Sequence, residues 1–377
     1  MKKTAIVILN WNTRDYLRKF LPGVLASAGC ATDGDCSMSE HEVIVADSAS
    51  TDGSMDLLAG MFPRMRTIAL DGNYGFTGGY NRALAKLEGQ FEYYLLLNSD
   101  VDVPRRWLGP LLNWMESHPE CGACAPKLHS WDRKDMFEYA GAAGGLLDRF
   151  GYPFCRGRLM KAVERDKGQY DSHPNEVFWV SGAAFLVRSA LWHRMGGLDD
   201  RFFAHMEEID LCWRMQLAGY SVCVVPGSMV LHLGGGTLPA ASPLKLRLNF
   251  RNNLLLLDNN LAKSYGSQIL RKTGKIDVAA HRGWKKAART ITLRMMLDGA
   301  SALVYLMTFR PKFFRAVLDA HREFRELRTE MDEAQLWNWL QQHGMDADIH
   351  GWYRGWIVCD SLLDRHTMWK RIHRFRA

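Results

Sequence analysis

Short apolar runs alternate with stretches of helical periodicity through the first hundred residues, and this alternation constrains the fold more than any other feature. Runs rich in β-formers predict four buried strands, at residues 4–9, 42–46, 66–70 and 93–97. The stretches between them have the spacing of amphipathic helices, from about Arg14, at residues 54–62 and at residues 83–87. Such an alternation predicts a mostly parallel sheet with helices on both faces.

The pattern changes in the second half of the chain. Further short strands are predicted at residues 177–180, 184–187 and 221–225, but after Pro243 long helical periodicity replaces the β-rich runs. The chain is 47% apolar and 24% charged, which is ordinary for a globular protein. Its length of 377 residues exceeds what one compact core usually covers. We therefore predict an α/β domain over residues 1–240 and a helical region over residues 241–377.

Neither the N-terminus nor the cysteines indicate a secreted protein. The first residues, MKKTAIVILNWN, resemble the start of a signal peptide, but their apolar run is short and Asn10 interrupts it. The eight cysteines include one CxxC, Cys121 and Cys124, and one loose pair, Cys30 and Cys36. No second CxxC or paired histidine completes the four ligands that zinc needs. We predict reduced thiols in a cytosolic protein.

Polar segments follow each of the four strands, at residues 10–12, 47–53, 71–81 and 98–102. Because ligands of parallel sheets bind beyond the carboxyl ends of the strands, these segments predict one binding rim. Asp100 and Asp102 follow the fourth strand directly, in LLLNSDVDV. An acidic pair there can hold a hard divalent cation, which neutralises a diphosphate, although aspartates are also common turn residues at strand ends.

Two other rim segments have the composition of a nucleotide pocket. Asp47, in VADSASTDGS, can accept a hydrogen bond from a pyrimidine ring or a ribose hydroxyl, while its neighbours can cap the next helix. DGNYGFTGGYNRA lacks the spacing of a dinucleotide fingerprint or a P-loop. Its glycines would let the backbone approach a ligand that Asn73 or Asn81 positions. The alternative is that the glycines only form a tight turn that leads into a helix.

A second carboxylate cluster lies in GGLDDRFFAHMEEIDLCWR, where Glu207, Glu208 and Asp210 begin a predicted helix. The helix dipole favours anions at this position, and one of these carboxylates could deprotonate an acceptor hydroxyl as a general base. His232 follows a short apolar segment and precedes three glycines, in VVPGSMVLHLGGGT. A lone histidine is often only a surface or core residue, but the glycines would let His232 reach a metal-bound diphosphate.

Taken together, these segments resemble family 2 of the inverting glycosyltransferases, which have the fold called GT-A, and within it the rhamnosyltransferase-like branch. Seven segments carry the resemblance in order over about residues 4–240: NWN, VADSASTDGS, NYGFTGGYN, LLNSDVDV, WVSGAAFLVR, GGLDDRFFAHMEEIDLCWR and HLGGGT. The resemblance implies transfer of a sugar from a nucleoside-diphosphate sugar to the hydroxyl of a saccharide or lipid-linked acceptor. It also implies a Mg²⁺ or Mn²⁺ cofactor and a place in surface polysaccharide or glycolipid synthesis.

By the same resemblance, the donor-binding residues lie on the rim. Asn12 and Asp47 would contact the nucleoside, and three residues would line the same pocket: Asn73, Gly79 and Asn81. Asp100 would be the principal metal ligand through the diphosphate, with Asp102 nearby.

The resemblance places the remaining site residues later in the chain. His232 would complete the metal or diphosphate site, and Ser181 and Gly182 would lie near the acceptor or donor sugar. The base position falls on Glu208, where the family usually has Asp, so that the choice between Glu207 and Glu208 stays open. Asn98 also stands where many relatives have a first Asp, which leaves the metal site with fewer carboxylates. The implied reaction is a single displacement without a covalent intermediate.

Two other functions are compatible with parts of the pattern. A sugar-1-phosphate nucleotidyltransferase can use a similar sheet and acidic metal site, but it usually has a Gly-rich N-terminal loop with Arg and Lys, which NWNTRDYL lacks. A non-catalytic module that binds nucleotide sugar would not need Asp100, Glu208 and His232 together.

The basic excess of the chain lies in its last part. From Arg271 onward there are 20 Lys and Arg against 12 Asp and Glu, while the whole chain has a net charge of +7. Basic residues flank an uncharged apolar run at 299–309, and Arg294 and Asp298 can pair at i,i+4. This region predicts either a packed helix or an interfacial helix on an anionic membrane, which would place the protein peripherally on the cytoplasmic face. No stacking or zinc motif indicates nucleic acid.

Overall fold

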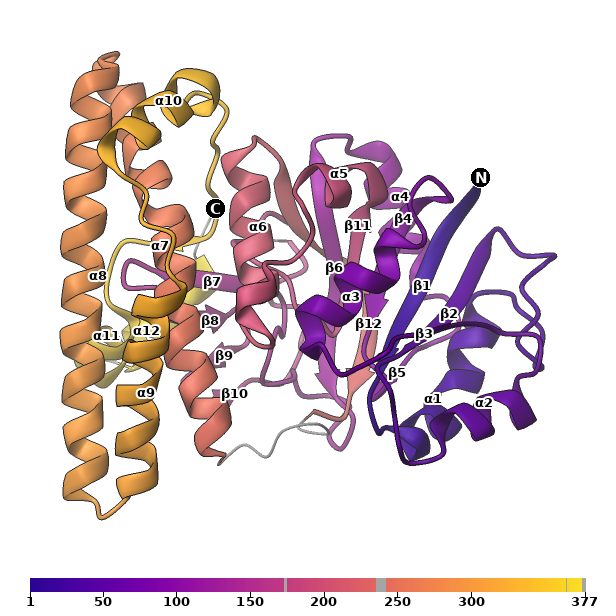
Figure 1. Cartoon of the computed structure of the whole chain (residues 1–377). Helices are drawn as coiled ribbons and strands as arrows, with labels where there is room; N and C mark the ends of the chain where they lie inside the picture. Colours follow the sequence, from indigo (N-terminus) through magenta and orange to yellow (C-terminus); the bar gives the residue numbers. More distant parts are fainter. Residues whose placement is uncertain (173–174, 235–241, 364, 375–377) are drawn as a thin grey trace.

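The computed structural model describes residues 1–172, 175–234, 242–363 and 365–374. Its main sheet has eight strands in the order β3-β2-β1-β4-β11-β6-β12-β5 (Figure 1). The four strands predicted first are parallel: β1 (Lys2–Asn10), β2 (His41–Asp47), β3 (Arg66–Ala69) and β4 (Phe91–Leu97). Each lies within two residues of its predicted bounds, which confirms the predicted α/β class.

The other half of the sheet is mixed in direction. Strand β11 (Ala184–Arg188) runs antiparallel between β4 and β6 (Cys121–Ser130). Strand β12 (Ser221–His232) is parallel to β6, and the short β5 (Val101–Asp102) pairs antiparallel with the end of β12. The strand predicted at 177–180 is wrong. This buried segment makes only an isolated bridge, Trp179 to Gly145, because buried apolar runs occur in irregular chain as well as in strands.

Helices cover both faces of the sheet, as the alternation predicted. One face is covered by α1 (Arg14–Ser27), α2 (Ser54–Met61) and α4 (Leu108–Ser117), and the other by α3 (Gly75–Ala85), α5 (Ser189–Arg194) and α6 (Glu207–Leu217). Alternate residues of β1 enter opposite cores: Ile6 and Ile8 pack with α1, and Ala5 and Val7 with α3. A short 3₁₀ turn, η1 (Asp200–Phe202), precedes α6.

A second sheet joins the middle of the chain to its C-terminal part. Four short strands pair antiparallel: β7 (Gly145–Asp148), β8 (Pro153–Cys155), β9 (Arg158–Leu159) and β10 (Ala162–Val163). The fifth, β13 (Trp352–Tyr353), is parallel to β7 and comes from near the C-terminus.

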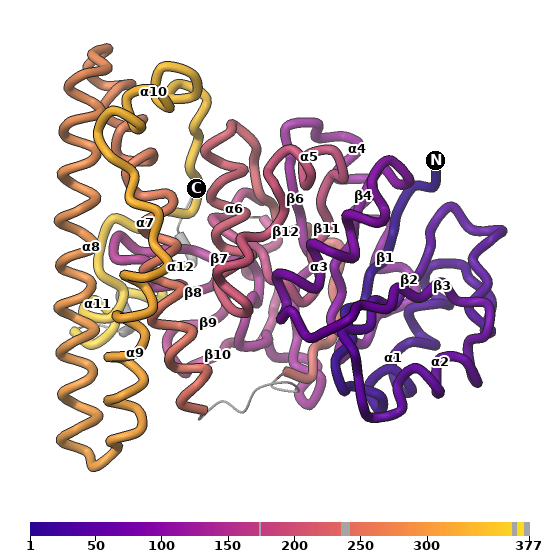
Figure 2. Tube along the Cα trace, in the orientation of Figure 1, coloured from indigo at the N-terminus to yellow at the C-terminus, as the bar shows by residue number. Residues whose placement is uncertain are grey.

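Three long helices stand side by side against this sheet and α6 (Figures 1 and 2). They are α7 (Pro243–Thr273), α8 (Ile276–Met307) and α9 (Pro311–Leu327), followed by α10 (Glu333–His343), α11 (Ile357–Leu363) and α12 (Arg365–Arg374). The predicted helical region is therefore confirmed. The boundary near residue 240 lies outside the described residues, and the division at 240 stays a prediction. Among the described residues, no helix combines the length and apolarity needed to cross a bilayer.

One expectation about the cysteines is wrong. Cys30 and Cys36 form a disulfide, because the turn between them brings their Cα atoms to 4.4 Å, within the reach of such a bond. The other six cysteines are free thiols, and five of them are buried.

Candidate active site

The ends of β1 and β2 carry a connected set of polar side chains. Asp47 is buried at the end of β2, and its Oδ1 accepts a hydrogen bond from Asn10 Nδ2 at 2.6 Å. Its Oδ2 accepts from the backbone N of Ser50 at 3.0 Å. Asn10, which we did not predict as a site residue, therefore orients the Asp47 carboxylate. The sequence feature that could have identified Asn10 is its position as an asparagine at the end of an apolar strand.

Asn12 connects the two loops at this edge. Its backbone lies in the left-handed region, with φ of 56°. Its Oδ1 accepts from the backbone N of Thr51 at 2.8 Å, and its own N donates to Ser50 Oγ at 3.0 Å. Asn12 and Asp47 thus belong to one hydrogen-bonded rim, which the sequence predicted for the nucleoside. Their contact with a nucleoside stays a prediction.

The three residues predicted in the glycine-rich segment have internal roles. Asn73 Oδ1 accepts from the N of Gly75 at 2.9 Å and so starts α3. A Cβ at Gly79 would lie 2.7 Å from the side chain of Leu9, because α3 packs closely on β1. Asn81 Nδ2 donates to the carbonyl of Leu198 and to a carboxylate oxygen of Asp200, both at 2.7 Å. These contacts account for the three residues locally, and their place in a nucleoside pocket stays a prediction.

Asp100 and His232 meet where β5 pairs with the end of β12. His232 Nε2 lies 3.2 Å from Asp100 Oδ1, and the two residues are 8% and 7% exposed. His232 Nδ1 lies 3.8 Å from Glu138 Oε1 and has no hydrogen-bond partner among the described residues. Asp102 lies on β5 opposite Leu231 and is half-buried. The structure therefore joins two predicted residues and adds Glu138, which sequence reasoning missed.

The charges around His232 decide its protonation. Burial lowers the pKa of its imidazole, but the hydrogen bond with Asp100 and the negative charges of Asp100 and Glu138 outweigh burial and raise the pKa to about 10. Without a bound cation, the positive imidazolium thus balances the carboxylates.

Carboxylate and imidazole are suitable ligands for Mn²⁺ and Mg²⁺, and a cation held by the buried Asp100 carboxylate would replace the imidazole proton of His232 as its counter-charge. Over the described ranges, no three His, Cys, Asp or Glu side chains gather closely enough to enclose a metal ion. Asp100 and His232 therefore fit a partial site, in which a diphosphate and water would supply the other ligands.

The loop before α6 has an unusual backbone. Phe203, His205 and Met206 have φ values of 62°, 73° and 74°, and none of them is glycine. Such conformations cost about 1–3 kcal/mol each and persist only where the surrounding structure holds them. Since Glu207 and Glu208 follow at once, this loop (residues 203–206, the base loop) sets the position of both carboxylates.

Side chains of α7 hold the base loop in place. The amide nitrogen of Asn252 lies 2.9, 2.8 and 2.7 Å from the carbonyl oxygens of Phe202, Ala204 and His205. Arg251 Nη2 donates to the carbonyl of Phe202 at 2.9 Å. Sequence reasoning missed both residues, although a polar triplet inside an apolar helical stretch, FRNNLLLL, was a visible signal.

The other side of the base loop rests on α3. The backbone N of Phe76 donates to the carbonyl of Phe203 at 2.8 Å. A Cβ at Gly75 would lie 2.4 Å from that same carbonyl oxygen, so that only glycine allows this approach.

Glu207 and Glu208 each have a buried Oε2 with no hydrogen-bond partner among the described residues. Burial, and then the charge of Glu208, raise the pKa of Glu207 well above its ordinary value. Burial raises the pKa of Glu208 to about 7. Asp210, the third carboxylate of the cluster, accepts from Asn259, Asn260 and Arg214 and is wholly committed to the contact between α6 and α7.

The segment predicted near the sugars connects the two carboxylate clusters. A Cβ at Gly182 would lie 3.8 Å from the Cβ of Glu208. The next residue, Ala183, accepts a hydrogen bond from the N of Asn98 at 3.0 Å, two residues before Asp100. Ser181 is buried at the same turn. Residues 181–183 therefore contact both the helix start that carries Glu208 and the segment that leads to Asp100; that the two carboxylates form one site stays a prediction.

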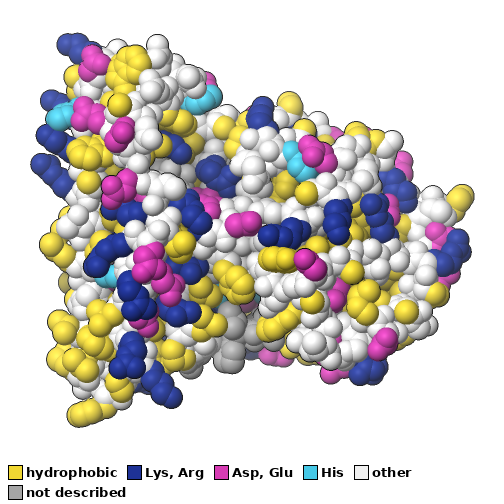
Figure 3. Space-filling model, in the orientation of Figure 1, with side chains coloured by type: hydrophobic (Ala, Val, Ile, Leu, Met, Phe, Trp, Pro, Cys, Tyr) yellow, Lys and Arg dark blue, Asp and Glu magenta, His cyan; other side chains and the backbone are white. Residues whose placement is uncertain are grey.

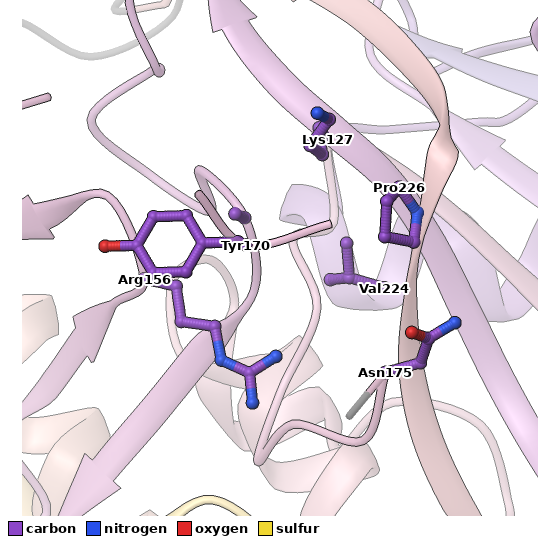
Figure 4. A pocket seen from close by; sticks show the side chains of 7 residues that line it. Lys127, Arg156, Tyr170, Asn175, Val224 and Pro226 are labelled. Atoms are coloured by element: carbon purple, nitrogen blue, oxygen red, sulfur yellow. The ribbon is translucent and has the colours of Figure 1, made fainter. Parts of the chain in front are cut away.

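A small cavity beside β6 and β12 is not part of this site. It is lined by Lys127, Ala143, Arg156, Tyr170, Asn175, Val224 and Pro226 (Figure 4). Its volume of about 10 Å³ has room for roughly one water molecule and none for a sugar or nucleotide.

Known proteins with similar sequences are glycosyltransferases. The family model for glycosyl transferase family 2 matches residues 5–179. The chain is 28% identical over 244 residues to N-acetylglucosaminyl-diphospho-decaprenol L-rhamnosyltransferase of Mycobacterium tuberculosis, covering 60% of this chain and 75% of that protein. It is 24% identical over 232 residues to rhamnosyltransferase WbbL of Escherichia coli, covering 60% and 82%. A solved mannosyltransferase of Pyrobaculum calidifontis, in complex with GDP-Man and Mn²⁺, gives a TM-score of 0.47 at 14% identity, covering 86% and 87%.

Proposed function

We propose that this chain, which belongs to glycosyl transferase family 2, is a metal-dependent inverting enzyme that transfers rhamnose or a related hexose from a nucleoside-diphosphate sugar. One observation carries the proposal. The turn at 181–183 contacts both the start of α6, which carries the candidate base Glu208, and the segment that leads to Asp100, whose side chain lies beside His232.

In the proposed reaction, the acceptor oxygen attacks the anomeric carbon from the side opposite the departing nucleoside diphosphate. A new C–O bond forms, the bond to the diphosphate breaks, and Glu208 takes the acceptor proton. Glu208 suits this role because its pKa of about 7 leaves part of it ionised at neutral pH. Glu207 is more strongly held in its neutral form, which favours Glu208 as the base.

Asp100 and His232 would hold the divalent ion, Mg²⁺ or Mn²⁺. When bound, such an ion compensates the negative charge that develops on the leaving diphosphate. The Asn10–Asp47 pair and Asn12 would orient the nucleoside at the neighbouring strand ends.

The curated relatives support a lipid-linked saccharide as the acceptor, because the name of the mycobacterial relative specifies a diphospho-decaprenol substrate. We propose that the chain works in cell-wall or surface polysaccharide synthesis. An acceptor of this kind is held in a membrane, which supports a peripheral location on the cytoplasmic face.

A screen of nucleotide sugars tests the proposal directly. The purified full chain is incubated with each nucleoside-diphosphate sugar and Mn²⁺ or Mg²⁺, and release of nucleoside diphosphate is measured with and without chelator. We expect release from one or few donors, only with the metal. Production of nucleotide sugar from a nucleoside triphosphate and a sugar 1-phosphate would instead show a nucleotidyltransferase.

A further inference from the structure

The second half of α8 has its apolar side facing outward. Leu293, Met296, Leu303 and Met307 are exposed, and they recur at the spacing of one helix face, with Ala300 between them. Val304 and Leu306 extend this surface toward the end of the helix. Figure 3 shows the apolar side chains gathered at the lower left of the molecule, where Figure 1 places the ends of α8 and α9.

The opposite face of α8 buries its charges. Arg294 Nε lies 2.8 Å from Asp298 Oδ1, and Arg294 Nη1 donates to the carbonyl of Phe150 at 2.8 Å. His321 Nε2, on α9, lies 3.5 Å from Asp298 Oδ2. Because these partners hold the charged face inside, α8 cannot rotate to bury its leucines and methionines.

The turn between α8 and α9 exposes one more large apolar side chain. Phe309 is 93% exposed and has a φ of 56°, a conformation that glycine adopts at lower cost. Neither packing nor backbone geometry of the described chain explains a phenylalanine here. Its side chain is available to an external apolar phase.

Basic residues surround this turn. Arg310, Lys312 and Arg315 are exposed just after it. Between residues 293 and 318, Asp298 is the only acidic residue, and it is buried in its pair with Arg294. The hairpin tip, which we define as residues 303–315, therefore combines an apolar surface with uncompensated positive charge.

We propose that the hairpin tip docks on an anionic lipid surface, with Met307 and Phe309 inserted among the acyl chains and the basic residues at the headgroups. The tip points toward the same end of the molecule as the carboxyl ends of β1 and β4, where the candidate site lies (Figure 1). Docking would thus bring a lipid-linked acceptor close to Glu208; this consequence rests on the proposed function, whereas lipid binding does not.

A second copy of the chain is a poorer occupant than a membrane. A two-fold symmetric contact between two tips would bring Arg310, Lys312 and Arg315 of one copy toward the same residues of the other. Anionic lipid neutralises these charges instead of repelling them.

Flotation of the full chain with vesicles tests the proposal. We expect recovery with vesicles of phosphatidylcholine and phosphatidylglycerol, much less with phosphatidylcholine alone, and less again at high salt. Met307→Asp should lower partition on the order of tenfold or more, since it puts a charge into the apolar phase. Met38→Asp is the matched control, because Met38 is 97% exposed on the catalytic part of the chain.

A second variant separates docking from folding. Phe309→Gly relieves the left-handed backbone, so the thermal midpoint should hold or rise while vesicle binding falls. Release of nucleoside diphosphate in detergent-free buffer should be unchanged in both tip variants, which distinguishes a failure of docking from a failure of the proposed activity. Equal recovery with both vesicle types, no recovery, or a lipid-free dimer that Met307→Asp dissociates would overturn the proposal.

Discussion

At the end of the rim predicted to bind the nucleoside, Asp47 and Asn12 are paired with neighbouring groups, whereas at the base end Glu207 and Glu208 each keep an unpartnered buried oxygen. Asp47 is held by Asn10 and by the backbone of Ser50, all within two neighbouring strand–loop units. Glu207 and Glu208 follow a strained loop, and their Oε2 atoms have no hydrogen-bond partner among the residues described.

The two ends of the rim are held in position by different kinds of contact. Local hydrogen bonds preorganise the nucleoside end before any ligand binds. At the base end, a buried acceptor without a partner costs about 1–3 kcal/mol, and α7 must hold the loop through Asn252. The position of Asp47 thus depends on local contacts, whereas the position of Glu207 and Glu208 depends on a helix about fifty residues away.

Loss of the base should have the largest effect. We expect Glu208→Gln to retain donor binding but to lose transfer by on the order of 10²-fold or more, because the amide cannot accept the acceptor proton. Single-turnover transfer and calorimetric donor binding measure the two properties separately. If Glu207→Gln shows this loss and Glu208→Gln does not, the base is Glu207.

The second largest effect should be on donor affinity. Asp100→Ala should remove the metal-dependent part of nucleoside-diphosphate binding, on the order of tenfold to 10²-fold, because a carboxylate ligand is lost. Calorimetry with nucleoside diphosphate, with and without Mn²⁺, measures it. A smaller loss of affinity in Asp102→Ala would support Asp100 as the principal metal ligand. If Asp100→Ala binds nucleoside diphosphate and Mn²⁺ as tightly as the unmodified chain does, Asp100 is not part of the metal site.

The pH dependence of transfer should report Glu208. Its pKa is raised to about 7, and the ionised form accepts the proton, so kcat/KM should fall as pH drops below that value. One pH unit below the pKa, about a tenth of Glu208 is ionised, which predicts a roughly tenfold loss relative to the rate at high pH, where Glu208 is fully ionised. The measurement is a pH profile with a fixed donor and acceptor; a profile that is flat across pH 7 would contradict the assignment.

A smaller effect tests the long-range support of the base loop. Asn252→Leu should lower kcat about fivefold with little change in the donor KM, since it moves the base and not the nucleoside rim. Amide hydrogen exchange over residues 203–208 should become faster. Asn260→Leu is the control on the same helix, because Asn260 contacts Asp210 and not the loop carbonyls. Equal kcat losses in both variants would mean a general loss of stability.

The sequence by itself determined the first half of the sheet and the rim of the site. Each predicted strand of that half is followed by its own polar motif, as at Asp47 and Asp100, and the alternation of strands and helices follows from local pattern. The family resemblance also placed His232 at the same site as Asp100, and the structure brings the two side chains together.

Only the tertiary structure decided the contacts between distant segments. These include the insertion of β11 between β4 and β6, Glu138 beside His232, the Cys30–Cys36 bond and the outward apolar face of α8. Helical periodicity shows that α7 has an apolar face, but not that Asn252 reaches the carbonyl of Phe202 and two carbonyls of the base loop. Such contacts depend on how whole helices and strands pack together. Sequence periodicity shows only which face of one helix or strand is apolar, and not which distant side chain meets it.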